Sequence, residues 1–289
     1  MLLRFLVVAS ETPSQRDERR RYTNEASDES YAATLTNLAP GCVCEHVSCI
    51  DRDDVPSAGE IQSYDGLFFA GSPIQMSEDS KEARRAARFM RAVFAAGVPA
   101  FGSCAGLQIA VVAAGGSVKP RSPRMEAGFA RGIVATAAGR KHPLLAGRPL
   151  TWDAPAMHSD EVDRLPEGAV LLASTQTTPV QAVEIRSGAG LFWGVQYHPE
   201  LTLGEIAASF RRQGDDLIEE GLCADKDDVE RFAGRVAALG VEPHRRDLAW
   251  QLGLDAEMTD PVRRTRELGN FIERVVHPRA REHGTAKAA

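Results

Sequence analysis

The chain has 289 residues, of which 43% are hydrophobic and 26% are charged. This length is enough to bury the core of one large domain together with a smaller extension. The formal net charge of −6 argues against a nucleic-acid-binding protein, because such a surface needs clustered basic residues. No apolar run approaches the roughly 18 residues of a membrane-spanning helix, so we expect no membrane association.

The first residues and the cysteine count indicate the compartment. Leu2–Ala9 is apolar but short, and it has no basic leader, so we expect a buried strand rather than a secretion signal. The five cysteines are an odd number without a secretory context. We therefore expect reduced thiols, no structural disulfides and a cytoplasmic location.

Apolar runs typical of strands alternate with helical patterns along the chain, which predicts an α/β fold around a mostly parallel sheet. Strands are predicted at residues 3–8, 42–50, 66–70, 98–102 and 191–197. Helices are predicted at 31–38, across Ala83–Phe94 with an end at Gly97, and at 107–114. Residues 10–30 are rich in charge and lack an apolar period, so we expect a polar loop there.

Three cysteines lie on one predicted strand without the pattern of a metal site. Cys42, Cys44 and Cys49 are accompanied by His46, but no second pair of ligands follows them. We therefore interpret them as thiols of a buried strand and expect no metal site. Cys223 lies in a polar helical region and carries no functional signal.

Another cysteine, Cys104, lies between two glycines just after the predicted strand 98–102. The pattern Gly102-x-Cys104-x-Gly106 before a helix is typical of a nucleophile elbow, a sharp turn that exposes a reactive side chain. Such a turn puts the thiol at a helix N-terminus, where the partial positive charge favours the thiolate. The backbone N–H groups of Ala105 and Gly71 could then stabilise an oxyanion.

A histidine and a glutamate follow the predicted strand 191–197. Pro199 ends this strand directly after His198, which puts the imidazole where catalytic groups of open α/β sheets gather. Glu200 could accept the imidazole N–H and direct the other nitrogen toward Cys104. Each motif alone has an ordinary interpretation, a buried thiol or a surface turn. Both together predict a cysteine nucleophile with its base and orienting carboxylate.

Both motifs resemble those of the class I glutamine amidotransferase domain, G-x-C-x-G-x-Q and G-x-Q-x-H-P-E, and the resemblance covers roughly residues 1–210. They occur here as Gly102-Ser103-Cys104-Ala105-Gly106-Leu107-Gln108 and Gly194-Val195-Gln196-Tyr197-His198-Pro199-Glu200. Two further segments are similar to those of GMP-synthase-type members, Met157-His158-Ser159-Asp160 and Pro179-Val180-Gln181-Ala182-Val183-Glu184. Ala70-Gly71-Ser72-Pro73 departs from the family's usual Gly-Gly-Pro loop, which leaves the second oxyanion donor open.

The resemblance implies a flavodoxin-like, three-layer fold in which helices flank a mostly parallel sheet. It implies a triad of Cys104, His198 and Glu200, with backbone oxyanion donors at Gly71 and Ala105. It also implies an L-glutamine substrate or a related γ-glutamyl amide, held partly by Gln108 and by the backbone near Met157, His158 and Ser159. The implied reaction passes through a γ-glutamyl thioester, releases glutamate and ammonia, and needs no metal or cofactor.

Nothing in the sequence resembles machinery for an ammonia acceptor. The chain lacks the G-x-x-x-x-G-K-[ST] loop and the S-G-G-x-D-S loop of ATP-pyrophosphatases, so we expect acceptor chemistry on another chain, an ATP-dependent synthase subunit. Residues 211–289 show helical patterns at 215–220, 229–233 and 265–276. They predict a C-terminal helical extension beyond a catalytic domain of residues 1–210. The extension could pack on that domain, or dock a synthase or a second copy of the chain in a homo-oligomer.

Three functions remain open on this basis. The first is a glutaminase-type amidotransferase, free-standing or as a subunit. The second keeps the same triad but hydrolyses another γ-glutamyl amide. The third is a regulatory protein that has kept the fold and lost turnover, and the intact triad of Cys104, His198 and Glu200 argues against it.

Overall fold

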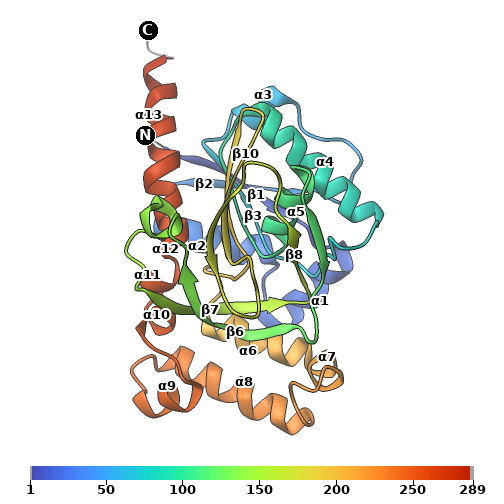
Figure 1. Cartoon of the computed structure of the whole chain (residues 1–289), viewed down its shortest axis with the longest axis vertical. Coiled ribbons are helices and arrows are strands. Elements are labelled where there is room, and N and C mark those ends of the chain that lie inside the picture. The colour runs from blue at the N-terminus through green and yellow to red at the C-terminus, as the bar shows by residue number, and fades with distance from the viewer. Residues whose placement is uncertain (1, 287–289) are drawn as a thin grey trace.

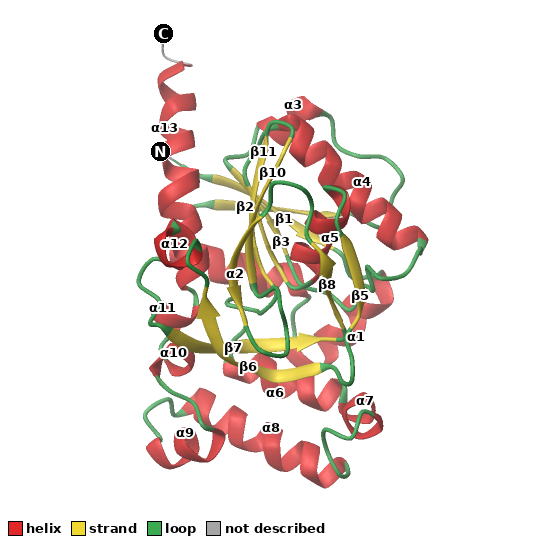
Figure 2. Cartoon of the chain, viewed as in Figure 1, coloured by secondary structure: helices red, strands yellow, loops and turns green. Residues whose placement is uncertain are grey.

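The computed structural model describes residues 2–286 (Figures 1 and 2). Its strands are β1 (Arg4–Ala9), β2 (Val43–Ser48), β3 (Gly66–Phe69), β4 (Ala100–Ser103), β5 (Ser117–Pro120), β6 (Glu126–Ala135), β7 (Thr151–His158), β8 (Asp160–Arg164), β9 (Val170–Ser174), β10 (Ala182–Ser187) and β11 (Gly190–Val195). Its α-helices are α1 (Pro13–Thr23), α2 (Ser27–Leu38), α3 (Ala58–Gln62), α4 (Lys81–Ala96), α5 (Ala105–Ala113), α6 (Leu203–Arg212), α7 (Gly214–Glu219), α8 (Lys226–Val241), α9 (Arg246–Leu252), α10 (Ala256–Thr259), α11 (Pro261–Arg264), α12 (Arg266–Phe271) and α13 (His277–Ala286). Shorter turns are 3₁₀ at Gly139–Lys141 and Pro143–Leu145 and π-helical at Ile272–Val276.

The main sheet has nine strands in the order β2-β1-β3-β4-β11-β10-β9-β6-β7. The pairs from β2 to β11 are parallel, and the pairs from β11 to β7 are antiparallel. β5 and β8 form a separate antiparallel pair. The predicted α/β sheet flanked by helices is confirmed, and its antiparallel half is an addition that the sequence did not reveal.

Helices cover both faces of the parallel strands, which gives the predicted three layers (Figure 2). Side chains of β1 alternate between the two faces, as the two-residue period of a strand requires. Phe5 and Val7 pack with α2 and α12, whereas Leu6 and Val8 pack with α4 and α5. Because both faces are buried, the parallel strands are almost continuously apolar.

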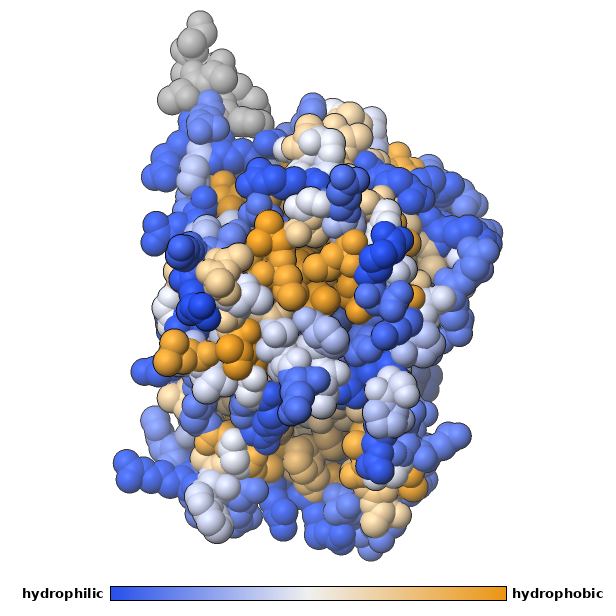
Figure 3. All heavy atoms as spheres, viewed as in Figure 1, coloured by the Kyte–Doolittle hydropathy of each residue, from blue (hydrophilic) through white to orange (hydrophobic). Residues whose placement is uncertain are grey.

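The outer surface is mostly polar. Figure 3 shows charged and polar residues over most of the viewed face, with apolar residues gathered at its middle over β10 and β8. Within residues 2–286, no helix combines the length and the apolar character that crossing a membrane requires.

The prediction of a polar loop at residues 10–30 is wrong, because α1 and the start of α2 occupy most of this segment. Of the residues of α1 only Arg19 is buried, so the helix has no apolar stripe for a periodicity analysis to detect. Its signal is the capping box between Thr12 and Gln15, with Pro13 at the first position. Ion pairs then hold it in place, Arg16–Asp51, Arg19–Glu205 and Arg20–Glu29.

The other predicted elements are confirmed, with shifted ends. α2 begins at Ser27 rather than at residue 31, and α4 ends at the predicted glycine, Gly97, whose φ of 69° caps the helix. β2 lies at the edge of the sheet and is only half-buried. The prediction that its thiols lie on a buried strand is therefore wrong. Cys42 and Cys44 are free thiols with sulfur atoms 3.8 Å apart.

The helices predicted for residues 211–289 are present, and Figure 1 shows them below the sheet and along one side of it. α8 and α9 pack with α6 in an apolar cluster beneath β6. Phe271 of α12 enters the core under the parallel strands, with its ring 5.6 Å from Phe68 and 5.7 Å from Trp193. The domain boundary near residue 210 stays a prediction.

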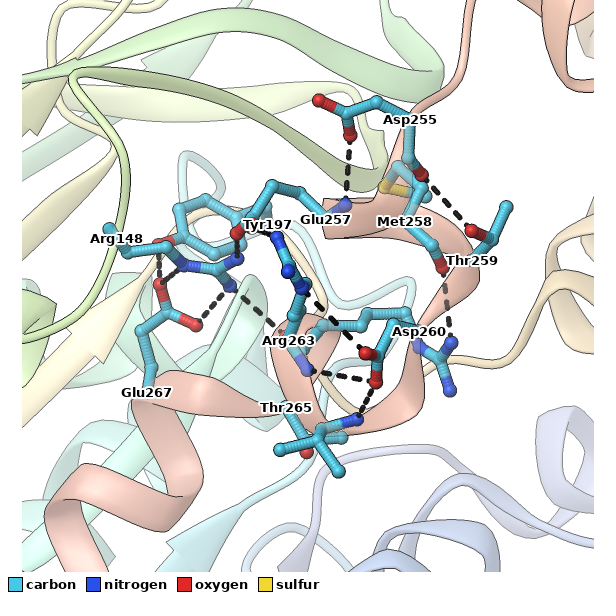
Figure 4. Close-up of polar contacts among 12 residues, drawn as sticks. Arg148, Tyr197, Asp255, Glu257, Met258, Thr259, Asp260, Arg263, Thr265 and Glu267 are labelled. Carbon is cyan, nitrogen blue, oxygen red and sulfur yellow. Dashed lines mark hydrogen bonds and ion pairs between the residues drawn. The ribbon is translucent and has the colours of Figure 1, made fainter.

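A buried ion pair joins these C-terminal helices to the sheet (Figure 4). Arg148 donates two hydrogen bonds to Glu267, at 2.7 and 2.6 Å, and a third to Glu257 at 2.7 Å. The hydroxyl of Tyr197 donates to Glu267 at 2.7 Å. Burial alone would lower the pKa of Arg148, but the charge of Glu267 outweighs it and raises that pKa. The segment after β11 is therefore tied to α12.

We expect Glu267→Ala to lower the free energy of unfolding by about 3 kcal/mol, because it leaves the buried Arg148 guanidinium short of a partner. Urea unfolding followed by circular dichroism measures the change. Asp247→Ala removes an exposed pair with Arg245 and serves as the control, with an unchanged unfolding midpoint. A loss as small as that of the control would contradict this role for Glu267.

Candidate active site

Cys104 lies at the turn between β4 and α5 with the backbone of a nucleophile elbow. Its φ of 51° and ψ of −108° are rare for a residue other than glycine. Its N–H donates to the carbonyl of Val195 on β11 at 2.8 Å, and α5 begins at the next residue. Gly106 has to be glycine, because a Cβ there would lie 2.6 Å from the carbonyl oxygen of Phe69. The thiol is thus held at the N-terminus of α5.

The second motif meets the first because β11 lies next to β4 in the parallel sheet. His198 follows β11, and its Nδ1 lies 2.8 Å from Glu200 Oε1. The imidazole and Cys104 border the same point, because a Cβ at Gly71 would overlap the ring and would lie 3.5 Å from Cys104 Cβ. All three side chains are at least nine-tenths buried. The structure brings together the three residues predicted as the triad, with Nδ1 on Glu200 and Nε2 left for the thiol.

Residues that the sequence analysis missed fix the carboxylate of Glu200. The hydroxyl of Ser103 donates to Glu200 Oε2 at 2.8 Å, and the hydroxyl of Tyr31 lies 3.2 Å from that of Ser103. Thr34 donates to the backbone carbonyl of Glu200 at 3.4 Å. Ser103 lies inside the cysteine motif, so its position was visible in the sequence. Tyr31 and Thr34 belong to α2, which no motif marks.

The electrostatics favour a protonated imidazole beside the thiol. Burial alone would lower the pKa of His198, but the charges of Glu200 and Cys104 outweigh it and raise the pKa to about 10. The protonated His198 imidazole stabilises the folded state. The full effect is present below a pH of about 6.5, the pKa of the imidazole in the unfolded chain, and it is lost as the pH rises through about 10. The imidazolium and the N-terminus of α5 both present positive charge toward Cys104.

The loop after β3 lies directly against the triad. A Cβ at Gly71 would lie 3.5 Å from Cys104 Cβ and would overlap the imidazole of His198. Ser72, where the family usually has glycine, anchors this loop, since its hydroxyl lies 2.7 Å from that of Ser10. The N–H of Ala105 has no intrahelical acceptor, because it belongs to the first turn of α5. Both predicted oxyanion donors therefore lie at Cys104.

A cavity of about 430 Å³ opens beside Cys104. Its wall includes all four residues predicted to hold glutamine, Gln108, Met157, His158 and Ser159. Acidic residues at and after α7 line it too, Asp216, Glu219 and Glu220. Residues of the predicted extension thus contribute to the cavity that contains the nucleophile.

Two of the predicted substrate-binding side chains already have protein partners. Gln108 Nε2 donates to the carbonyl of Asp160 at 2.9 Å and lies 3.3 Å from Gln196 Oε1. His158 Nδ1 donates to the same carbonyl at 2.8 Å, and its Nε2 lies 2.8 Å from Glu126. Burial would raise the pKa of Glu126, but His158 outweighs it and lowers that pKa. The imidazole of His158 therefore ties β7 to β6. This is compatible with the resemblance, which implied only the backbone of residues 157–159 as a substrate ligand.

The arrangement supplies what acyl transfer needs: a thiol nucleophile, a base oriented by a carboxylate, and backbone donors at the same point. Across the part of the chain that the structure describes, no group of three or more histidine, cysteine or carboxylate side chains is placed to hold a metal ion.

The sequence matches the family model for glutamine amidotransferase class-I over residues 36–214. The chain belongs to the class I glutamine amidotransferase family. It is 32% identical over 284 residues to a γ-glutamyl-L-1-hydroxyisopropylamide hydrolase of Pseudomonas sp, covering 96% of this chain and 95% of that protein. It is 33% identical over 180 residues to a GMP synthase (glutamine-hydrolyzing) of Leifsonia xyli subsp. xyli, covering 60% of this chain and 33% of that protein. The match therefore spans about a third of that GMP synthase.

Solved structures share the fold. A glutamine amidotransferase from Thermotoga maritima has a TM-score of 0.56 at 15% identity, over 90% of this chain and 99% of that one. A glutamine amido transferase from Methylobacillus Flagellatus has a TM-score of 0.54 at 20% identity, over 88% and 96%. The predicted family and fold are confirmed, and the protein is an amide-hydrolysing enzyme of this family.

We expect Gly71→Ala to lower kcat/KM for glutamine hydrolysis about 100-fold, because the new methyl group displaces the imidazole of His198. Ammonia release measures the effect. Gly59→Ala is the matched control, since a Cβ at this exposed position meets no atom within 4 Å. If Gly71→Ala retained the activity of the control, the contact between the loop and His198 would have no role in turnover.

Proposed function

We propose that the protein hydrolyses the side-chain amide of L-glutamine through a triad of Cys104, His198 and Glu200. The observation that carries this proposal is the position of Cys104 on a nucleophile elbow, beside an imidazole that Glu200 orients. Family membership gives the reaction class. The geometry at Cys104 supports the proposed residue roles.

The steps follow from the groups at the turn. The Cys104 thiolate attacks the amide carbonyl, and the N–H groups of Ala105 and Gly71 hold the oxyanion. His198 gives its proton to the departing nitrogen, which leaves as ammonia, and a γ-glutamyl thioester remains. Water, deprotonated by His198, then attacks the thioester and releases glutamate. Gln108 and the backbone of 157–159 hold the α-amino and α-carboxylate groups.

A second candidate is the hydrolysis of a γ-glutamyl amide whose nitrogen carries a substituent. The relative from Pseudomonas sp is named as a hydrolase of such an amide, and its similarity extends over 96% of this chain, the C-terminal helices included. The same triad serves both substrates, because only the group on the departing nitrogen differs.

Use of the ammonia by a synthase on another chain is part of the proposal, supported by the match to the glutamine-hydrolyzing GMP synthases. A cytoplasmic location and a homo-oligomer belong to it as well. Copurification of a partner chain tests the synthase. The mass of the purified protein in solution tests the homo-oligomer, and cell fractionation tests the location.

The experiment is incubation of the wild type and Cys104→Ala with L-glutamine and a panel of γ-glutamyl amides, with glutamate and ammonia or amine measured. We expect turnover by the wild type only, and covalent labelling of Cys104 by an electrophilic glutamine analogue. If the wild type hydrolysed no member and Cys104 stayed unlabelled, the protein would instead be a regulatory homologue.

We expect Glu200→Gln to shift the basic limb of the pH profile of kcat/KM to lower pH. The carboxylate is the main group that raises the pKa of His198 against the effect of burial. Without that charge the pKa falls, so the imidazole loses its proton at lower pH and cannot protonate the departing nitrogen. An unchanged basic limb in Glu200→Gln would show that Glu200 does not tune His198.

A further inference from the structure

The loop after β3, residues 71–77, forms part of the wall of two cavities at the proposed active site. Ser72 and Pro73 line the cavity of about 430 Å³ that contains Cys104, and they also line a smaller one of about 50 Å³ that His198 borders. Gly71 lies so close to the imidazole that a Cβ there would overlap it. The position of this loop therefore decides where the backbone of Gly71 lies relative to Cys104.

The N–H of Gly71 is the second donor that the proposed function assigns to the oxyanion. Gly71 is buried at the edge of the smaller cavity, and its N–H has no hydrogen-bond acceptor within residues 2–286. The N–H of the preceding residue, Ala70, differs, because it donates to the carbonyl of Val8 on β1 at 3.1 Å. Buried N–H groups without an acceptor are rare in folded proteins, so this one is free to bind a substrate oxygen.

A pair of hydroxyl groups fixes the first half of the loop. Ser72 Oγ lies 2.7 Å from Ser10 Oγ and accepts a hydrogen bond from the N–H of Ile74 at 3.3 Å. Ser10 follows β1 directly and is 1% exposed, so its own position is set by the sheet. The next residue, Glu11, is fully buried and accepts two hydrogen bonds from Ser27 of α2. The loop is thus tied through Ser72 to β1 and α2.

The far end of the loop is held by a carboxylate. Ser77 donates two hydrogen bonds to Asp160, from its backbone N–H and from its hydroxyl, both at 2.9 Å. The backbone carbonyl of Asp160 in turn accepts from Gln108 at 2.9 Å, and both residues line the larger cavity. Contacts within one chain therefore hold the loop at both ends.

We propose that Ser10 and Ser72 are positioning residues that hold the N–H of Gly71 at the oxyanion site, so that this chain hydrolyses its substrate without a partner chain. The inference rests on the proposed function, because the oxyanion forms only when Cys104 attacks. The two serines act through Gly71 rather than on the substrate. Use of the released ammonia by a synthase is a separate, later step.

The kinetic signature follows from when the oxyanion exists. The substrate carbonyl is neutral when it binds and gains negative charge only during the attack. A displaced N–H donor therefore lowers kcat and leaves KM nearly unchanged, whereas a distorted substrate cavity raises KM.

The first test removes one hydroxyl group of the pair. We expect Ser72→Ala to lower kcat about tenfold for the best substrate of the γ-glutamyl amide panel, with KM within about twofold of the wild type. Ser72→Thr keeps a hydroxyl group and should retain at least about half of the wild-type kcat. Ser117→Ala is the control, because the hydroxyl of Ser117 bonds Asp163 and Ser117 lines neither cavity, so both constants should be unchanged.

A double-mutant cycle tests whether the two hydroxyl groups act through each other. Ser10→Ala should lower kcat by about the same factor as Ser72→Ala, and the double variant should lose no more than either single variant. Multiplied losses in the double variant would overturn the tether. Wild-type kcat in Ser72→Ala, or a loss that appears only in KM, would overturn the role at the oxyanion. Because Ser72 is only half-buried, Ser72→Ala serves if Ser10→Ala does not fold.

The wild-type chain, purified without any other chain, tests the independence from a partner. We expect turnover of at least one γ-glutamyl amide by this chain alone. Labelling of Cys104 by an electrophilic glutamine analogue without any turnover would overturn the preformed donor while leaving Cys104 as the nucleophile. Neither labelling nor turnover would be a failure of the proposed function itself.

Discussion

The backbone of Cys104 is held at a positive φ between two neighbours, the carbonyl of Val195 on β11 and the first turn of α5. A residue other than glycine keeps such a conformation only where the surrounding structure determines it. Here the determinants are the parallel pairing of β4 with β11 and the close approach of Gly106 to β3. The packing of the sheet therefore keeps Cys104 in this strained conformation. As a result, the turn brings together the thiol, the N-terminus of α5 and the loop after β3.

The histidine of the proposed triad is supported from two directions. On one side Glu200 holds its Nδ1, and Ser103 with Tyr31 of α2 holds Glu200. On the other side Tyr197, the residue before His198, is bonded to the buried pair of Arg148 and Glu267. Since Glu267 belongs to α12, the C-terminal helices contribute to the placement of the imidazole as well as to the wall of the cavity.

Much of the fold and the triad could be predicted because their signals are local. The strands β1, β3 and β4 are buried on both faces and therefore appear as short apolar runs, and α4 has a full apolar stripe that ends at Gly97. α1 could not be found in this way, because its stability comes from a cap and from ion pairs to distant residues. The antiparallel strands β6, β7 and β9 were missed, and the motifs gave no information on them.

The sequence by itself determined the family, the elbow and the three residues that meet at it, because two short motifs at the ends of strands specify both the chemistry and the fold. Only the tertiary structure decided what surrounds them. Tyr31 with Ser103, Ser103 with Glu200, and Glu267 with Tyr197 are hydrogen-bonded pairs 70 to 97 positions apart in the sequence. No local pattern encodes such pairings, because they depend on which strand ends and helix faces the folded sheet brings together.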